Sequence, residues 1–397
     1  MGMLKIGEYN MSRKDRPCLL RQESFGGTLF NVDNGKRLYV DNSEFSLLER
    51  TGTLTDHLQT ELRAALIDVI IRRPPELFDY SFSGPDKVFF ELTRACNIRC
   101  LECLNSSGIA LSKELTEADV LKAIDDLAEF GAQEIRFTGG EPMIATALPV
   151  YIRRTNEWGL RVSIGTNAML ATGTLAEMLA ESGLDTAIVS IDGLEDNHNR
   201  IRGKGSFKKT FEGMRNLRSA GIEVRINMVI LNKNVEDVVP FVEMAIQERL
   251  SVMLRRFIAS GRGARLTQGG ITWEKYEKLR EDLEPYFKNP YVHIDGHYLK
   301  NEQTPSRIPL PFQRSACSAG QRGLVILPDG NIQTCGFLAA LGEPAYGNVL
   351  HTPMSQLWKS TVTSRYLLTR RAMIDQSSPS KSWGNECLAL IETGQSH

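Results

Sequence analysis

Apolar residues in the middle of the chain form short runs, and longer amphipathic segments separate them. Between residues 88 and 265, the runs have the length and β-branched composition of buried strands, and the intervening segments repeat apolar residues at helical spacing. The predicted strands are 88–93, 134–139, 161–166, 186–191, 223–230 and 252–258. The predicted helices are 116–130, 146–157, 173–182, 207–220 and 235–248. This alternation predicts an α/β fold of parallel βαβ units, with functional residues at the carboxyl ends of the strands.

Residues 1–84 have a different pattern and are predicted to form a separate N-terminal module. Alternating apolar residues flank an Asp33-Asn34-Gly35 turn, which predicts a β-hairpin over 26–40. The two helices predicted after the hairpin are 43–51 and 55–72. Short strands followed by helices indicate a small winged-helix-like α+β module. One role that such a module can have is that of a cap that shields the rest of the chain.

Residues 266–397 change character again and are predicted to form a third unit. A helix is predicted at 273–287. A hairpin follows, with its turn at Pro328-Asp329-Gly330 and a cysteine at each end, Cys317 and Cys335.

Composition and charge describe an ordinary enzyme. Apolar residues make up 42% of the 397 residues and charged residues 24%, and the formal net charge is −1. Without a basic excess, nucleic acid is not expected as the main partner. No apolar run is long enough for a membrane span, and the first residues lack a secretory signal pattern. Seven cysteines, an odd number, indicate a reducing compartment, so the expected location is the cytoplasm.

Three of the cysteines form the most informative motif. Cys96, Cys100 and Cys103 have C-x3-C-x2-C spacing directly after a predicted strand. Three thiolates on one short loop can hold three irons of a 4Fe-4S cluster and leave the fourth iron without a protein ligand. A second motif, Gly139-Gly140-Glu141-Pro142, follows the next predicted strand.

These two motifs, in this order, resemble the radical S-adenosylmethionine (SAM) superfamily. The resemblance implies a (β/α)6 partial barrel over 88–265 and a 4Fe-4S cluster whose open iron binds SAM. An electron delivered to the cluster, by a reductase or flavodoxin-type donor, then cleaves SAM to a 5′-deoxyadenosyl radical. Glu102 departs from the family pattern, which usually has an aromatic residue before the last cysteine.

The resemblance also implies a set of SAM-binding residues. The two glycines let the backbone approach SAM closely, and Glu141 resembles an acidic residue beside the SAM ammonium group. Ser190 matches a SAM-contacting serine, although a serine on a strand is also a common filler. Arg225, predicted as a buried strand arginine, holds the SAM carboxylate or a substrate group, or forms a structural ion pair. The expected SAM-binding set is Gly139, Gly140, Glu141, Pro142, Thr166, Ser190 and Arg225.

Cys317 and Cys335 resemble the start of a SPASM or twitch auxiliary-cluster domain. Gly330 has the spacing before the second cysteine that this motif requires. With Cys387, these cysteines are expected to bind a second, auxiliary 4Fe-4S cluster. In the alternative, Cys387 is a free thiol that donates a hydrogen atom to a radical intermediate.

The expected function is radical-based C–H activation of a substrate. The N-terminal module resembles the recognition element of enzymes that mature ribosomally made peptides, and the run 100–108 resembles the corresponding loop of mycofactocin peptide maturases. A peptide substrate is therefore expected first. The alternative is a small-molecule dehydrogenase or epimerase acting on an aminocyclitol or sugar, a class that a single-cluster twitch domain suits better.

Overall fold

The centre of the protein is a nine-stranded, mostly parallel sheet. The computed structural model describes residues 16–64, 68–79, 81–266, 268–294 and 318–364. The strand order is β11-β10-β9-β8-β7-β6-β5-β12-β13, and all neighbours from β11 to β12 are parallel. The six strands predicted from sequence are β5 (Lys87–Glu91), β6 (Glu134–Thr138), β7 (Arg161–Thr166), β8 (Thr186–Ser190), β9 (Glu223–Ile230) and β10 (Ser251–Arg256). The α/β class is confirmed.

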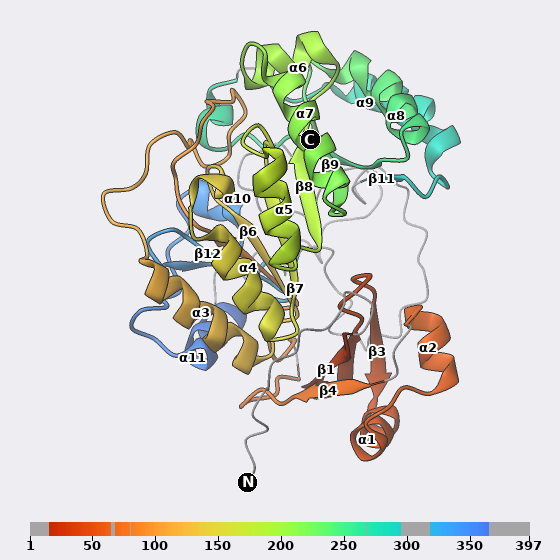
Figure 1. Ribbon diagram of the computed structural model, residues 1–397, viewed down its shortest axis with the longest axis vertical. Coiled ribbons are helices and arrows are strands. Elements are labelled where there is room, and N and C mark those ends of the chain that lie inside the picture. Colours follow the sequence, from red (N-terminus) through yellow and green to blue (C-terminus); the bar gives the residue numbers. More distant parts are fainter. Residues whose placement is uncertain (1–15, 65–67, 80, 267, 295–317, 365–397) are drawn as a thin grey trace.

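Helices cover one face of this sheet and follow one another around its outside (Figure 1). The five predicted helices are α3 (Glu117–Phe130), α4 (Leu148–Glu157), α5 (Gly173–Glu181), α7 (Ser206–Ser219) and α8 (Val238–Gln247). A further helix, α6 (Glu195–Arg202), follows β8. Capping residues define the ends: Thr116 and Asp119 form a capping box at the start of α3, and Gly131, at φ 101°, ends it.

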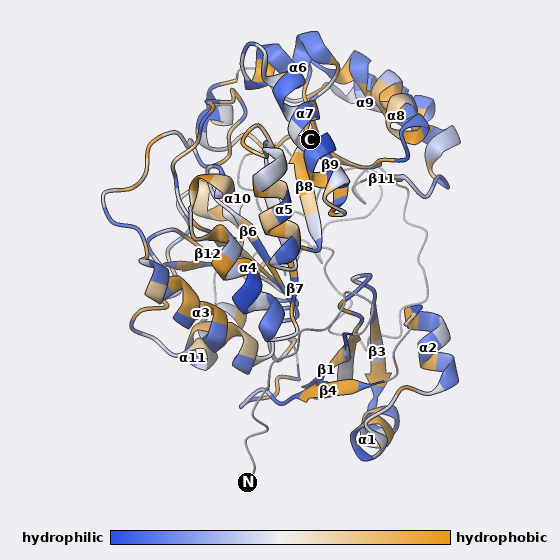
Figure 2. Ribbon diagram, in the orientation of Figure 1, coloured by the Kyte–Doolittle hydropathy of each residue, from blue (hydrophilic) through white to orange (hydrophobic). Residues whose placement is uncertain are grey.

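The two faces of the sheet differ in polarity. Alternate residues of each strand, such as Val88 and Phe90 of β5, are fully buried against the helices. The strands accordingly include apolar, orange segments in Figure 2. The opposite face lines the interior of the partial barrel, the lumen, and the register places many polar residues on it. They are Lys87, Glu134, Arg136, Ser163, Thr186, Glu223, Arg225, Asn227 and Arg255.

The N-terminal module contains a four-stranded sheet with the order β3-β2-β1-β4. Its elements are β1 (Cys18–Glu23), β2 (Gly26–Phe30), β3 (Arg37–Asp41), α1 (Asn42–Thr51), α2 (Asp56–Leu62) and β4 (Val69–Arg72). The predicted hairpin is β2–β3. The helix predicted over 55–72 begins as expected after its N-cap Thr55, but its extension to residue 72 was wrong. Helix α2 ends at Leu62, and Arg63 takes a left-handed conformation with φ 51°. The β-branched run of β4 instead pairs with β1, a long-range partner that local periodicity does not reveal.

A buried arginine joins this module to the barrel. Arg21 is fully buried; its Nε donates to Glu23 Oε1 at 2.8 Å and its Nη2 to Asp86 Oδ1 at 2.7 Å. Its Nη1 donates to the Pro85 carbonyl at 2.9 Å. From the barrel side, Arg161 Nη1 donates to the Val32 carbonyl at 2.7 Å. These charged hydrogen bonds fix the module against the amino ends of the barrel strands.

The C-terminal hairpin belongs to the central sheet. Strand β12 (Gly323–Ile326) pairs in parallel with β5, and β13 (Ile332–Gln333) pairs antiparallel with β12, which confirms the hairpin. The predicted helix over 273–287 appears as α9 (Trp273–Leu283) followed by the 3-10 helix η4 (Glu284–Tyr286). The other elements are η1 (Pro142–Ile144), η2 (Val235–Asp237), η3 (Gly261–Arg265), β11 (Val292–Ile294), α10 (Gly336–Ala340) and α11 (Met354–Val362).

The division into units at 1–84, 88–265 and 266–397 stays a prediction. Cys317 and Cys387 lie outside the described residues. Among the residues that are described, no helix has the length and apolar character needed to cross a membrane.

Candidate active site

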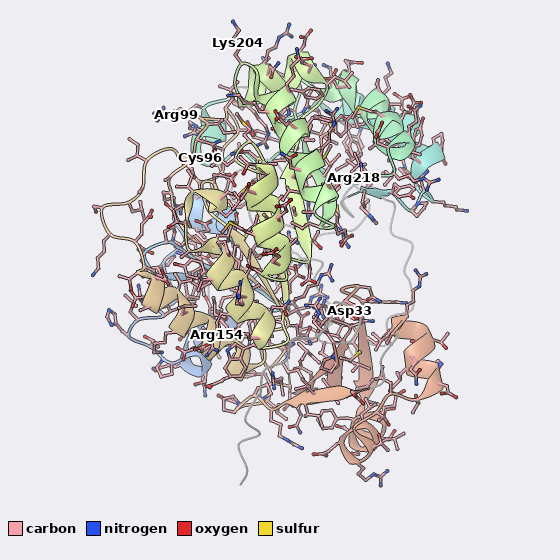
Figure 3. All side chains as sticks on the ribbon, in the orientation of Figure 1. Asp33, Cys96, Arg99, Arg154, Lys204 and Arg218 are labelled. Atoms are coloured by element: carbon pink, nitrogen blue, oxygen red, sulfur yellow. The ribbon has the colours of Figure 1, made fainter. Side chains whose placement is uncertain are left out.

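The cysteine loop follows β5 at the carboxyl end of the barrel strands. Backbone hydrogen bonds shape it: Cys96 N donates to Gly108 O at 3.3 Å, and Leu101 N donates to Ile201 O at 3.0 Å. Cys96 lies far from Asp33 of the N-terminal module, on the other side of the molecule (Figure 3). The cysteines therefore lie at the end of the barrel opposite the module, as parallel βα topology requires.

Burial and nearby charges affect the thiols of this loop. Burial raises the pKa of Cys100 to about 12, with further increases from Glu102 and Cys103, although Arg202 opposes them. Burial likewise raises the pKa of Cys96, and the Cys103 charge adds to it. Iron binding has to displace these protons, since only thiolates ligate iron.

The three cysteines remain predicted ligands of a cluster. Within the described residues, no three His, Cys, Asp or Glu side chains converge on one metal position. A 4Fe-4S cluster does not require that convergence, because each thiolate binds a different iron. Cys96, Cys100 and Cys103 would hold three irons of such a cluster.

Arg262 holds the cysteine loop through hydrogen bonds to its backbone carbonyls. It belongs to η3, and its Nε donates to the Cys100 carbonyl at 2.8 Å while its Nη1 donates to the Ser107 carbonyl at 2.7 Å. Its own backbone N donates to the Cys103 carbonyl at 3.0 Å. The loop is therefore held by a residue distant in sequence, which sequence motifs did not reveal.

The Gly139–Pro142 segment packs directly against the cysteine loop. Gly140 N donates to Thr93 O at 2.6 Å, and Glu141 N donates to Ala95 O at 2.9 Å. A Cβ at position 140 would lie 1.9 Å from Ala95 O, and one at position 139, where φ is 130°, would lie 2.4 Å from Thr93 O. Both glycines are therefore required to bring the two loops together.

Glu141 organises the centre of the site. Its fully buried carboxylate accepts from Thr166 Oγ1 at 2.6 Å, Asn167 N at 2.8 Å and Met143 N at 3.2 Å. Burial still leaves its pKa above the usual value, although these donors lower it. Pro142, also buried, is the first residue of η1. Thr166 is thus a partner of Glu141, and the structure brings Glu141, Pro142 and Thr166 together beside the cysteine loop.

The guanidinium group of Arg202 lies beside Cys100. Arg202 of α6 donates through Nε to Asp192 Oδ2 at 2.6 Å, and its Nη1 lies 3.8 Å from Cys100 Sγ. Its Nη2 lies 3.3 Å from Glu102 Oε1. Burial raises the pKa of Glu102 to about 7, although Arg202 opposes the shift. Glu102 thus takes part in an arginine network. From the sequence, Arg202 was expected in a basic run at the solvated surface or facing an acidic substrate, and Asp192 had no predicted role. The structure instead buries Arg202 beside Cys100. The signal for both is their place after β8, at the same strand ends as the motifs.

The remaining two predicted SAM-binding residues lie at different levels of the lumen. Ser190 is the last residue of β8, at its carboxyl end, and its register partner is Asn227. Arg225 lies in the first half of β9, away from that end. Its side chain is 44% exposed and its Nε donates to Glu223 Oε1 at 2.8 Å, so the expectation of a buried arginine was wrong. Ser190 is therefore at the carboxyl end of its strand and Arg225 is not, and the SAM-binding role of each stays a prediction.

Comparison with known proteins agrees with this fold. Residues 90–245 match the family model of the radical SAM superfamily. The chain is 30% identical over 283 residues to the mycofactocin maturase MftC of Mycolicibacterium smegmatis, covering 70% of this chain and 71% of that protein. It is 27% identical over 307 residues to the Fe-coproporphyrin III synthase of Methanosarcina barkeri, covering 72% and 76%.

A solved structure extends the likeness over nearly the whole chain. Streptococcus suis SuiB bound to S-adenosylmethionine has a TM-score of 0.68 at 16% identity, covering 95% of this chain and 96% of that chain. The protein belongs to the radical SAM superfamily. Membership implies a 4Fe-4S cluster and SAM as its cofactors, whereas the individual ligand residues and the auxiliary cluster stay predictions.

Proposed function

We propose that the protein is a radical SAM enzyme that modifies a ribosomally made peptide by removing a hydrogen atom from it. When bound, the cluster and SAM would supply the electron and the 5′-deoxyadenosyl radical for this step. The chain supplies the ligand loop at Cys96, Cys100 and Cys103, the close backbone approach at Gly140 and the buried support of Glu141. Together they would hold both cofactors at the carboxyl end of the lumen.

The observation that carries a peptide substrate is the N-terminal module with its edge strand. Within the described residues, β3 has one strand neighbour, β2. An edge strand can bind an extended peptide through main-chain hydrogen bonds. Strand β3 also contacts the barrel: Arg37 Nε donates to Gln133 Oε1 at 2.9 Å, and Tyr39 Oη lies 3.3 Å from Arg322 Nη1. A peptide bound along β3 would therefore begin at the junction with the barrel.

The similarity to other proteins supports the same proposal. One relative is named as a maturase, and SuiB was also solved bound to the precursor peptide SuiA. That complex has a TM-score of 0.69 and covers 96% of this chain, the N-terminal module included. We include an auxiliary 4Fe-4S cluster in the proposal, with Cys317, Cys335 and Cys387 as its ligands.

A small-molecule substrate is the second candidate. Other relatives are named for haem synthesis, including the AdoMet-dependent heme synthase of Nitratidesulfovibrio vulgaris, at 27% identity over 312 residues. In this case the reaction would be a dehydrogenation or epimerisation of a small molecule such as an aminocyclitol or sugar, and the N-terminal module would act as a cap.

Co-expression distinguishes the two candidates. The chain is expressed anaerobically with each short peptide reading frame that lies beside its gene, and the peptides are analysed by mass spectrometry. A mass loss on one peptide, absent with the Cys96/Cys100/Cys103→Ala variant, is the expected result. If no peptide changes mass while a sugar or aminocyclitol stimulates 5′-deoxyadenosine formation, the small-molecule candidate replaces the peptide.

A further inference from the structure

Three arginines on neighbouring and opposite strands face the lumen. Arg136 lies on β6, and Arg225 and Arg255 lie on β9 and β10. The register can be followed from β6 to β9. Arg136 on β6 pairs with Ser163 on β7, Ser163 pairs with Thr186 on β8, and Thr186 pairs with Glu223 on β9. Register partners in a parallel sheet face the same side, so Arg136 and Arg225 share the lumen face. Arg255 is in register with Val229, two positions along from Asn227 on that same face.

Arg136 is held rigidly, with its guanidinium inside the lumen. Its side chain is only 19% exposed, and the guanidinium lies 5.3 Å from the centre of the Phe89 ring. Its Nε donates to Ser163 Oγ at 3.2 Å, and its Nη2 lies 3.5 Å from Glu134 Oε1. In the described part of the chain, Nη1 has no hydrogen-bond acceptor. Within the described residues, Arg136 is therefore oriented in advance for one further acceptor.

The lumen carboxylates beside Arg136 and Arg225 are already shared. Glu134 has two cationic partners. Lys87 Nζ lies 2.9 Å from Glu134 Oε2, and Arg136 Nη2 lies 3.5 Å from Glu134 Oε1. Glu223 bonds Arg161 at 3.2 Å as well as Arg225 at 2.8 Å. Among the described residues, these two carboxylates thus serve four cations, which leaves this group of six side chains with a net positive charge.

The arginines also act on one another. Burial lowers the pKa of Arg136, and the charges of Arg255 and Arg225 lower it further, although Glu134 opposes them. Like charges that repel in a half-buried space favour the binding of an anion between them. Guanidinium groups bind carboxylates through paired hydrogen bonds, so a carboxylate matches this arrangement.

We propose that Arg136, Arg225 and Arg255 form a binding site for a substrate carboxylate in the barrel lumen. The inference rests on the proposed function, because it assigns a chemical class to the substrate that this lumen receives. The carboxylate belongs either to an acidic side chain of the peptide or to its C-terminus. The three arginines are positioning residues: they hold one end of the substrate and thereby decide which hydrogen is presented at the carboxyl end of the strands.

Three size-matched probes test the site without turnover. N-acetylglutamate amide carries a side-chain carboxylate, N-acetylglutamine a C-terminal carboxylate, and N-acetylglutamine amide carries neither. Their affinities for the full, anaerobically reconstituted chain are measured by ligand-observed NMR with SAM present, so that the carboxylate site of SAM is filled. At least one anionic probe is expected to bind with a Kd on the order of 1 mM. The neutral probe is expected to bind at least about tenfold more weakly. Which anionic probe binds identifies the source of the carboxylate.

Variants localise the binding. Arg136→Gln, Arg225→Gln and Arg255→Gln are each expected to weaken the anionic probe about tenfold or more, the loss of a charged hydrogen bond. Arg154→Gln, on the surface of α4 and paired with Asp125, is the matched control and keeps full affinity. Arg225 is half-exposed, so its variant folds even if the buried Arg136 variant does not. Iron content confirms the folded state of each variant.

The inference is overturned if the neutral probe binds as well as the anionic ones, or if Arg225→Gln and Arg255→Gln leave the affinity unchanged. Its failure can be told apart from failure of the proposed function. Binding without any modified peptide would contradict the peptide proposal alone. A modified peptide whose carboxylates can all be amidated without loss of modification would contradict the arginine site alone.

Discussion

Single atoms decide whether the two motif loops can meet. Backbone hydrogen bonds from Gly140 and Glu141 join the Gly139–Pro142 segment (GGEP) to the cysteine loop. The space between the two excludes even one methyl group. From the sequence, Gly139 and Gly140 were expected to let the protein backbone approach SAM closely. The structure adds that both are needed first for the approach of protein backbone to protein backbone.

Gly140→Ala is expected to disrupt the site. The new Cβ would meet Ala95 O at 1.9 Å, so one of the two loops has to shift. We expect a loss of about 1–3 kcal/mol in the free energy of unfolding and about 100-fold in SAM cleavage. Gly173→Ala is the control, because its Cβ would meet nothing within 4 Å. Chemical unfolding and 5′-deoxyadenosine formation are the measurements; equal activities of the two variants would contradict the packing argument.

A buried histidine makes stability depend on pH. His198 is fully buried; burial, with a contribution from Arg202, lowers its pKa from 6.5 to about 4, although Asp192 opposes the shift. Its Nδ1 accepts from Asp192 N at 3.3 Å. Between pH 6.5 and 4 the unfolded chain binds this proton and the folded chain does not. The free energy of unfolding therefore falls by about 3 kcal/mol as the pH falls through that window.

His198→Gln is expected to remove this part of the pH dependence while keeping an acceptor for Asp192 N. Histidine NMR titration of the wild type should show that His198 is still neutral at pH 5. A normal titration of His198 near 6.5 would refute the assignment.

At the scale of elements, the cysteine loop depends on support from η3. Two charged hydrogen bonds from Arg262 fix the carbonyl of Cys100 and that of Ser107, which follows the last cysteine. The loop has little regular structure of its own, so this support holds the three thiols in place. The supporting residue lies 162 positions from Cys100.

Arg262→Ala is expected to loosen the cluster. Loss of the two hydrogen bonds costs about 1.5–3 kcal/mol each, and iron should pass to a chelator several-fold faster than in the wild type. Arg265→Ala, an exposed neighbour on η3, is the control and should match the wild type. Identical rates of iron release for the two variants would show that Arg262 does not stabilise the loop.

The elements also show what the sequence can predict. Strands β5 to β10 and their helices were identified because each combines a clear hydrophobic period with capping or turn residues. The run of β4 was misassigned because its strand character depends on β1, some 50 residues earlier. The pairing of β12 with β5 was not predicted for the same reason.

In the active site too, some residues could be identified from the sequence and others could not. Cys96, Cys100, Cys103 and the GGEP segment were found because their spacing is itself the signal. Arg202 and Arg262 were missed because each acts through a tertiary contact that no motif records.

At the scale of the whole molecule, the N-terminal module is a fixed part of the protein. Arg21 connects it to the barrel through Asp86 and two backbone carbonyls, with no exposure to solvent. In the proposed function, this rigid junction fixes the position of β3 relative to the lumen. A peptide bound at the module would then be directed to one side of the barrel.

Arg21→Ala is expected to weaken this junction. It leaves Glu23 and Asp86 buried without their common partner, which costs about 3–5 kcal/mol. Calorimetry should show the module unfolding before the barrel, whereas Arg50→Ala, an exposed arginine of α1, should unfold like the wild type. A single unchanged transition for Arg21→Ala would mean that the junction is held by other contacts.

The most direct test of the central claim is 5′-deoxyadenosine formation by the anaerobically reconstituted chain with SAM and a strong reductant. The wild type is expected to form 5′-deoxyadenosine, and the Cys96/Cys100/Cys103→Ala variant is expected to form none and to lose about four irons per chain. If the variant, checked to be folded, still forms 5′-deoxyadenosine at the wild-type rate, these cysteines do not hold the cluster that cleaves SAM, and the account is wrong.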